Sequence, residues 1–284
     1  MSRALQQHWP EYLIEAWALG TFMVSAALFT ALLEYPVSPV HQLIANGHAR
    51  RALVGLAMGL TAIALIYSPW GQRSGAHMNP ATTLTFLRLG KIQPWDAAFY
   101  IGAQFIGGLC GVLLSKLVLR DIIAHPSVSY VTTVPGSAGV GAAFVAEAIM
   151  ACGMMLTVLF VTNTPKVTRL TGCFAGALVS LYITVAAPLS GMSINPARTT
   201  ASALPSGIWT SGWIYFTAPV LGMMLAAQLH RFLSGSSPRA CPKLHHGATQ
   251  QCIFCGQSRK RNAAARNLCG ERNSRKDSTG PATH

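Results

Sequence analysis

The chain carries the tripeptide Asn-Pro-Ala twice, at Asn79-Pro80-Ala81 and at Asn195-Pro196-Ala197. The flanking sequence repeats as well, because Ser74-Gly75 and Ser190-Gly191 precede the two copies at the same distance. Asn is a favoured helix N-cap, and Pro is tolerated at the first helical position, where its missing N–H would have no partner anyway. The pattern predicts that each copy begins a short helix with its positive end at the motif.

Six apolar segments are each close to the roughly 20 residues that cross a hydrocarbon core of about 30 Å. The chain is 51% hydrophobic and only 10% charged, whereas soluble domains carry about 25% charged residues. The first segment is too long for the apolar region of a signal peptide and is interpreted as a first span. We therefore predict an all-α integral membrane protein with six transmembrane helices, at about residues 11–33, 50–69, 95–119, 138–162, 169–188 and 209–232.

The two tripeptides lie between the second and third segments and between the fifth and sixth. A helix over residues 79–89 would rise about 15 Å, roughly half of the membrane, so each copy predicts a re-entrant half-helix. Non-helical backbone at this depth is tolerated where protein buries it or where it lines a watery cavity. With three spans and one half-helix in each repeat, at about 11–119 and 138–233, the second repeat enters from the opposite side. This is an inverted repeat with its site at the midplane.

The formal net charge of +13 is mainly a property of the tail, because nine of the 21 Lys and Arg residues follow residue 234. It therefore gives little reason to expect a nucleic-acid partner. We predict an N-terminal segment over 1–10, a membrane domain over 11–233 and a basic tail over 234–284. The Lys and Arg of the connecting loops gather mainly on the tail's side, which predicts a multi-pass protein of the plasma or inner membrane with both termini cytoplasmic. Glycines within the spans predict close helix contacts, notably Gly102, Gly107, Gly108, Gly111, Gly172 and Gly176.

The paired motifs, the Arg198 that follows the second one, the repeated Glu15 and Glu147, and the Ser-Gly before each motif resemble the aquaporin or major intrinsic protein family over about residues 10–233. The resemblance implies a six-helix bundle with a pore in each subunit and a homotetramer in the lipid bilayer. It also implies a passive channel that conducts water and/or small uncharged solutes and excludes ions and protons, without a cofactor for transport.

Other functions stay open at this stage. One alternative is a facilitator of glycerol or another small neutral solute with little water transport. A secondary transporter is more remote, because it needs paired coupling charges at the midplane and the spans offer only Arg198, Glu15 and Glu147. An enzyme is not expected, since the spans contain no Ser/His/Asp or paired-carboxylate set.

Asn79 and Asn195 can serve the pore as well as cap the half-helices. If the helix holds the side-chain oxygen, the amide N–H groups remain as donors for a passing oxygen atom. The two converging positive helix ends also oppose cations, as in aquaporin-type pores generally. The alternative interpretation is that the two residues only cap their helices.

Arg198 lies three positions after Asn195, on the same helix face and roughly one turn further from the midplane. A charge inside the membrane is costly and indicates a function by default. The resemblance implies that Arg198 is the charged wall of a narrow selectivity filter. The alternative is an interfacial Arg whose head reaches the membrane surface.

By the family's motif, the other filter positions fall on Met58, Ile183 and Met192. Water-selective members usually carry an aromatic residue and a His at the first two places, and glycerol-conducting members usually carry an Asp after the Arg, where this chain has Thr199. The filter is therefore expected to be more apolar than in either subclass. Met58 and Ile183 could also be ordinary core residues.

Glu15 and Glu147 are acids within apolar spans, and we expect them to hold the loop backbones by accepting N–H bonds. A proton relay is the alternative. His77, in the first loop, is expected to pack that loop rather than to act as a pH gate.

The tail contains Cys241-x3-His245-x6-Cys252-x2-Cys255. Four Cys and His ligands suit tetrahedral zinc, and a short tail has no core that would order it without a metal. His246 is an alternative ligand, and cysteines without any common role are the alternative to the site. The basic clusters at 259–261 and 272–276 are expected to contact anionic lipid or solvent.

Overall fold

The structure is a computed structural model that describes residues 1–235, 241–245 and 252–255. The described residues form helices and loops without any strand, which confirms the all-α prediction. The long helices are α1 (Ser2–Glu34), α3 (Gly47–Tyr67), α6 (Pro94–Leu119), α8 (Gly139–Asn163), α9 (Thr171–Ser190) and α11 (Trp213–Ser234). The shorter ones are α2 (Pro39–Leu43), α4 (Pro69–Ser74), α5 (Pro80–Arg88), α7 (Asp121–Ala124) and α10 (Pro196–Ser206), with 3-10 turns η1 (Ser129–Val131) and η2 (Thr168–Leu170).

Among the described helices, α1, α3, α6, α8 and α9 are long and apolar enough to cross a membrane. Helix α11 has 22 residues but is less apolar, because Gln228, His230 and Arg231 lie in its last turns. Its place in the second repeat corresponds to that of α6 in the first, which makes it the sixth span. The two predicted half-helices are α5, with 9 residues, and α10, with 11.

Helix α1 begins at Ser2, well before the predicted start near residue 11. Its polar first turns are fixed to neighbouring helices. His8 Nδ1 lies 2.8 Å from Asp96 Oδ1 on α6, and the Tyr12 hydroxyl donates to the same oxygen at 2.6 Å. On the same side, Arg73 Nε donates to Glu11 Oε1 at 2.8 Å. These side-chain partners extend the helix beyond the apolar run.

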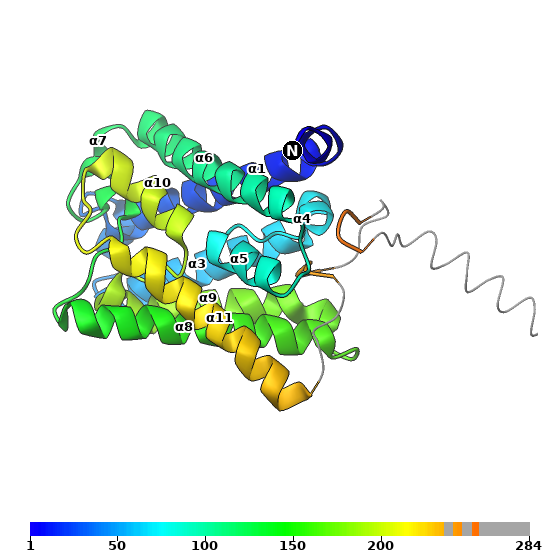
Figure 1. Ribbon diagram of the computed structural model, residues 1–284. Helices are drawn as coiled ribbons and strands as arrows, with labels where there is room; N and C mark the ends of the chain where they lie inside the picture. Colours follow the sequence, from blue (N-terminus) through cyan, green and yellow to red (C-terminus); the bar gives the residue numbers. More distant parts are fainter. Residues whose placement is uncertain (236–240, 246–251, 256–284) are drawn as a thin grey trace, which may run out of the picture.

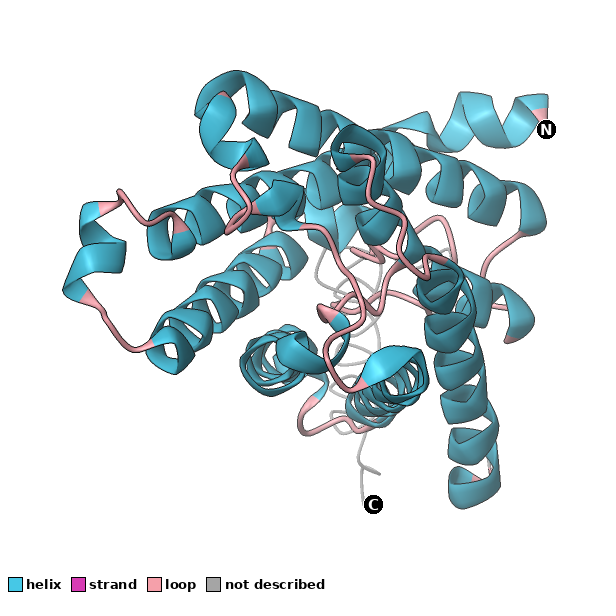
Figure 2. Ribbon diagram, turned by 90° about the vertical axis from the view of Figure 1, so that its left-hand side faces the viewer, coloured by secondary structure: helices cyan, strands magenta, loops and turns pink. Residues whose placement is uncertain are grey.

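The contacts between helices follow an internal two-fold symmetry. Helix α1 packs along α6 as α8 packs along α11, and α3 packs on α9. The half-helices cross between the repeats, because α5 packs against α11 while α10 packs against α6. Seen end-on, the helices surround a centre that is crossed by loops (Figure 2). The N-terminus and the described residues 241–245 and 252–255 lie at the same end of the bundle (Figure 1), which we call the tail-side end; the opposite end is the far end.

Glycines bring the paired helices into backbone contact. A Cβ added at Gly107 would lie 2.0 Å from the carbonyl oxygen of Ala16, and one at Gly222 in the second repeat would lie 2.3 Å from that of Ala148. A Cβ at Gly59 would lie 2.4 Å from the oxygen of Gly176. The prediction of close contacts does not extend to Gly102, where an added Cβ meets nothing within 4 Å.

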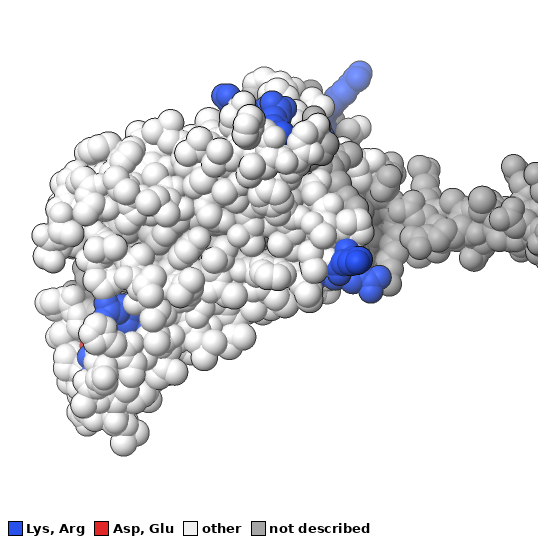
Figure 3. Space-filling model, turned by 90° about the horizontal axis from the view of Figure 1, so that it is seen from below, with Lys and Arg blue, Asp and Glu red and all other residues white. Residues whose placement is uncertain are grey.

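The outer surface is apolar, as a lipid-facing surface requires. Ile106, Leu117 and Ile149 on α6 and α8 are 64%, 76% and 66% exposed. On the face shown in Figure 3 the Lys and Arg side chains gather in a few groups toward the margins, and the broad surface between them carries no charge. In this view the molecule thus presents charge toward its margins and uncharged residues between them.

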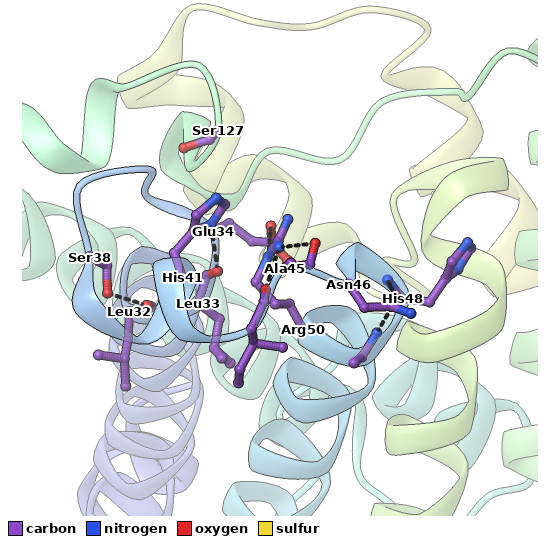
Figure 4. A network of polar contacts seen from close by, with 12 residues as sticks. Leu32, Leu33, Glu34, Ser38, His41, Ala45, Asn46, His48, Arg50 and Ser127 are labelled. Atoms are coloured by element: carbon purple, nitrogen blue, oxygen red, sulfur yellow. Dashed lines mark hydrogen bonds and ion pairs between the residues drawn. The ribbon is translucent and has the colours of Figure 1, made fainter.

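At the far end, a polar network ties the end of α1 to the start of α3 (Figure 4). Arg50 Nε lies 3.2 Å from Glu34 Oε2, and Arg50 Nη1 donates to the carbonyl of Ile44 at 2.7 Å. Asn46 caps α3 by accepting from the backbone N–H of His48 at 2.9 Å. The network fixes this loop at the rim of the central cavity.

Candidate functional site: a cavity between two opposed half-helices

Each half-helix begins at its Asn-Pro pair. The Asn79 side-chain oxygen accepts from the backbone N–H of Ala81 at 2.9 Å. The Asn195 oxygen accepts from Ala197 at 3.0 Å and from Arg198 at 3.2 Å. Pro occupies the first helical position in both, so the sequence places a cap and a helix start at each motif.

The asparagines also bind each other's loops. Asn79 Nδ2 donates to the carbonyl of Ile194 at 2.7 Å, and Asn195 Nδ2 donates to the carbonyl of Met78 at 2.7 Å. Each acceptor belongs to the residue directly before the other asparagine. The N-termini of the half-helices α5 and α10 are therefore held together at the centre of the molecule.

The loops before the two motifs have the same unusual backbone. Ala76 and Met78 have positive φ angles of 53° and 49°, and Met192 and Ile194 have 51° and 47°. Such left-handed conformations cost about 1–3 kcal/mol each for residues other than Gly and persist where the surroundings over-determine them. They recur at equivalent positions of the two repeats, so both loops need an outside support.

The first loop is supported by Glu15. Its Oε1 accepts from the Ser74 hydroxyl at 2.8 Å and from the backbone N–H of His77 at 3.0 Å. Its Oε2 accepts from the N–H of Met78 at 2.7 Å and from Gln104 Nε2 at 2.9 Å. A buried carboxylate is tolerable when hydrogen bonds replace its hydration.

Glu147 has the same arrangement in the second loop. Its Oε1 accepts from the Ser190 hydroxyl at 2.7 Å and from the N–H of Ser193 at 2.8 Å, and its Oε2 accepts from the N–H of Ile194 at 2.5 Å. The donors are at the positions equivalent to Ser74, His77 and Met78. Both acids lie at 0% exposure.

Two tyrosines that sequence reasoning did not assign to the site complete the loops. The Tyr100 hydroxyl donates to the carbonyl of Ser74 at 2.8 Å, and the Tyr215 hydroxyl donates to that of Ser190 at 2.6 Å. The signal was present, since both belong to the repeated pattern Tyr-x-x-Ala-x-x-x-Gly. His77 also packs the first loop, with Nδ1 3.1 Å from the Thr83 hydroxyl and the ring stacked on Phe86.

A cavity of about 980 Å³ runs through the centre. At the far end it is lined by Glu34 and Arg51, and at the tail-side end by His77 and Leu244. Between these ends the lining includes every residue predicted for the pore except the motif Pro and Ala: Asn79, Asn195, Arg198, Met58, Ile183 and Met192. Met58 is thus both a core residue, at 2% exposure, and part of the wall.

Arg198 is placed beside this cavity by α10. Its Nη1 donates to the carbonyl of Val131 at 2.7 Å. Arg198 belongs to the first turn of α10, three residues after Asn195. This bond to the Val131 carbonyl holds the guanidinium within the protein. The first repeat has Thr82 at the equivalent place, whose hydroxyl lies 3.5 Å from Met223 Sδ.

In the tail, three of the four predicted metal ligands come together. The Sγ atoms of Cys241, Cys252 and Cys255 lie within 4.8 Å of one another, and those of Cys241 and Cys252 are 3.6 Å apart. This contact with Cys252, together with burial, raises the pKa of the Cys241 thiol. The His245 ring lies instead against Tyr67, with 4.9 Å between centroids. The alternative ligand His246 and the basic clusters at 259–261 and 272–276 lie outside the described residues.

Comparison with known proteins relates the chain to channels. Residues 6–230 match the family model described as Major intrinsic protein. The chain is 34% identical over 218 residues to Aquaporin NIP2-2 of Zea mays, covering 76% of this chain and 72% of that one. It is 34% identical over 266 residues to Aquaporin NIP2-1 of Oryza sativa subsp. japonica, covering 88% and 84%. The fold is similar to an aquaglyceroporin structure from Plasmodium falciparum, with a TM-score of 0.65 and 18% identity over 79% of this chain and 96% of that one.

Proposed function

This chain belongs to the major intrinsic protein family, and on that premise we propose that its central cavity conducts water and small uncharged solutes past Arg198 while excluding ions and protons. Family membership makes the chain a passive multi-pass membrane channel rather than an enzyme. The proposal concerns which residues select the permeant and which solutes the channel conducts.

The observation that carries the proposal is the reciprocal pairing of Asn79 and Asn195 at the cavity. Each amide has two N–H donors; one binds the opposite loop, and the other can serve a permeant oxygen. A water molecule that accepts from both asparagines is turned so that it cannot relay a proton along a chain of waters. Two positive helix ends meet at the same point and oppose cations.

Arg198 adds a full positive charge about one turn from this point. Glu15 and Glu147 accept from the loop N–H groups and Ser hydroxyls. In the described part of the chain Arg198 lines the cavity and these two acids do not, so a permeant meets the guanidinium directly. In this proposal the acids support the loops and take no part in proton transfer. Cations thus meet a positive barrier, whereas neutral molecules do not.

Met58, Ile183 and Met192 would form the rest of the filter. An apolar wall opposite one guanidinium suits a molecule with a carbon side and a hydroxyl side, as well as water. This composition supports small neutral solutes such as glycerol beside water as permeants. A channel for such solutes with little water transport is the second candidate, and the same apolar lining favours it.

Swelling and shrinking of proteoliposomes tests both candidates. Light scattering after a sucrose step measures water flux, and a glycerol step measures solute entry. We expect faster relaxation than in empty liposomes in both. Water flux alone would exclude the solute role, and rates equal to those of empty liposomes in every gradient would overturn the channel proposal.

Three further points belong to the proposal. We propose a homotetramer in the plasma or inner membrane, which cross-linking in native membranes tests. We propose that both termini are cytoplasmic, because Lys and Arg of the loops gather at the tail-side end.

Transport needs no cofactor, but the cysteine group of the tail binds zinc. Metal analysis of purified protein with and without residues 236–284 tests this last point.

A further inference from the structure

The described parts of the tail, residues 241–245 and 252–255, lie against the tail-side end of the bundle beside α4 and α5 (Figure 1). We call them the tail segment. The Leu244 N–H donates to the carbonyl of Gly75 at 3.3 Å, and His77 Nε2 donates to the carbonyl of Pro242 at 3.2 Å. Both bundle partners belong to the loop that leads to Asn79. The tail segment is thus hydrogen-bonded to the loop before Asn79, which we call the pore loop.

Side chains of the tail segment also pack at the loop that leads to Asn79. Leu244 is 7% exposed, belongs to the main apolar core and lines the central cavity. The Phe254 ring stacks on His77, with 6.1 Å between centroids and an interplanar angle of 10°. Lys243 is 5% exposed, and its Nζ donates to the carbonyl of Gln72 near the end of α4 at 3.0 Å. A seated tail segment therefore narrows the tail-side end of the channel.

The cysteine group joins the two halves of this segment. Zinc binds thiolate sulfur at about 2.3 Å, so two sulfurs on one tetrahedral zinc lie about 3.8 Å apart. The 3.6 Å between Cys241 and Cys252, and the 4.8 Å limit for all three sulfurs, match this spacing. One ion would tie residue 241, before Leu244, to residues 252 and 255, on either side of Phe254. The tail segment is short, so such a cross-link would contribute much of its order.

We propose that Cys241, Cys252 and Cys255 form a zinc site whose occupancy holds the tail segment in the tail-side end and closes the channel. Loss of zinc releases Leu244 and Phe254 from the pore loop and opens it. The inference rests on the proposed channel function and on the proposed zinc site. A ligand that binds only the seated form shifts the seated-to-released ratio by about a hundredfold at one hundred times its dissociation constant.

The test uses the full-length protein in proteoliposomes, with zinc buffered at defined free concentration on both sides of the membrane or with a chelator. We expect water permeability to fall several-fold with zinc and to return with chelator. Cys252→Ser should show the high permeability in both conditions. Cys110→Ser, an exposed cysteine on α6, should respond as the unmodified protein does. Leu244→Ala should still bind zinc by metal analysis but close less completely.

Trypsin provides a second readout, independent of transport. Lys243 is buried in the seated segment, so zinc should slow cleavage after Lys243 in the unmodified protein and not in Cys252→Ser. A protein that binds zinc but has the same permeability with zinc and chelator would overturn the inference while leaving the channel function intact. If zinc is not bound at all, the inference also fails. Permeability equal to that of empty liposomes in every variant, including one without residues 236–284, would overturn both.

Discussion

Asn79 and Asn195 each donate a side-chain N–H to the backbone carbonyl that precedes the other, at 2.7 Å in both directions. The bonds join half-helices from the two repeats, which otherwise pack mainly against α11 and α6. Each amide therefore has two tasks in the structure, because its oxygen caps a helix and one N–H joins the repeats. In the proposed channel the second N–H serves the permeant as a third task. A single residue type meets all three needs.

Substitutions at Asn79 should separate the cap from the bond between loops. Asn79→Ala loses both, and a lost cap costs about 1 kcal/mol and a lost hydrogen bond a similar amount. Asn79→Ser keeps an oxygen for the cap but is too short to reach Ile194. We expect the thermal unfolding midpoint in detergent to fall in the order Asn, Ser, Ala. Equal midpoints for Ser and Ala would show that the cap contributes nothing measurable.

Replacing Arg198 should open the channel to charge. A unit charge contributes about 4 kcal/mol to the barrier for a cation at about 4 Å when the effective dielectric constant is about 20, and each 1.4 kcal/mol is about tenfold. Arg198→Ala should therefore raise proton leak at least about tenfold, measured with a pH-sensitive dye inside proteoliposomes. Arg198→Lys keeps the charge and should leak much less. An unchanged leak in the Ala variant would remove Arg198 from the barrier.

The crossing of α1 and α6 should tolerate no side chain at Gly107. An added Cβ lies 2.0 Å from the Ala16 carbonyl oxygen, so the helices must separate, at a cost of about 1–3 kcal/mol. Gly102→Ala is the matched control in the same helix, where the Cβ meets nothing within 4 Å and should stabilise the helix by about 0.5–1 kcal/mol. Detergent unfolding midpoints should move in opposite directions. A shift of the same sign in both would contradict this account.

The spans and half-helices could be predicted because their signals are local. Asn-Pro marks a helix start wherever it occurs, and long apolar runs reveal spans without reference to neighbours. The start of α1 could not be predicted this way, because it depends on His8 and Tyr12 meeting Asp96, which is more than 80 residues away in the sequence. Long-range partners of this kind leave no local pattern.

In the candidate site, too, repeated sequence features could be predicted and long-range contacts could not. Repeated residues such as Glu15 and Glu147 could be found by comparing the copies, and Tyr100 and Tyr215 were visible in the same comparison without a reason to assign them a role. The packing of the tail segment on the loop before Asn79 could not be predicted, because no second copy of this segment exists for comparison. The spacing of its cysteines also resembles that of an isolated metal site. The spacing of Cys241, Cys252 and Cys255 indicated that they share a metal ion. His245 fitted the same pattern, but its ring lies against Tyr67.

The apolar wall of the cavity should decide between water and solutes. Glycerol that passes Ile183 with its carbon side toward the wall gains about 0.8 kcal/mol for each CH₂ removed from water, which is about fourfold in rate. Ile183→His replaces this contact with a polar ring that water can bind. The ratio of glycerol to water permeability in proteoliposomes should therefore fall several-fold, whereas Ile183→Val, which keeps the wall apolar, should leave it nearly constant. If both variants change the ratio equally, the width of the cavity at this residue, rather than the chemistry of its wall, selects the permeant.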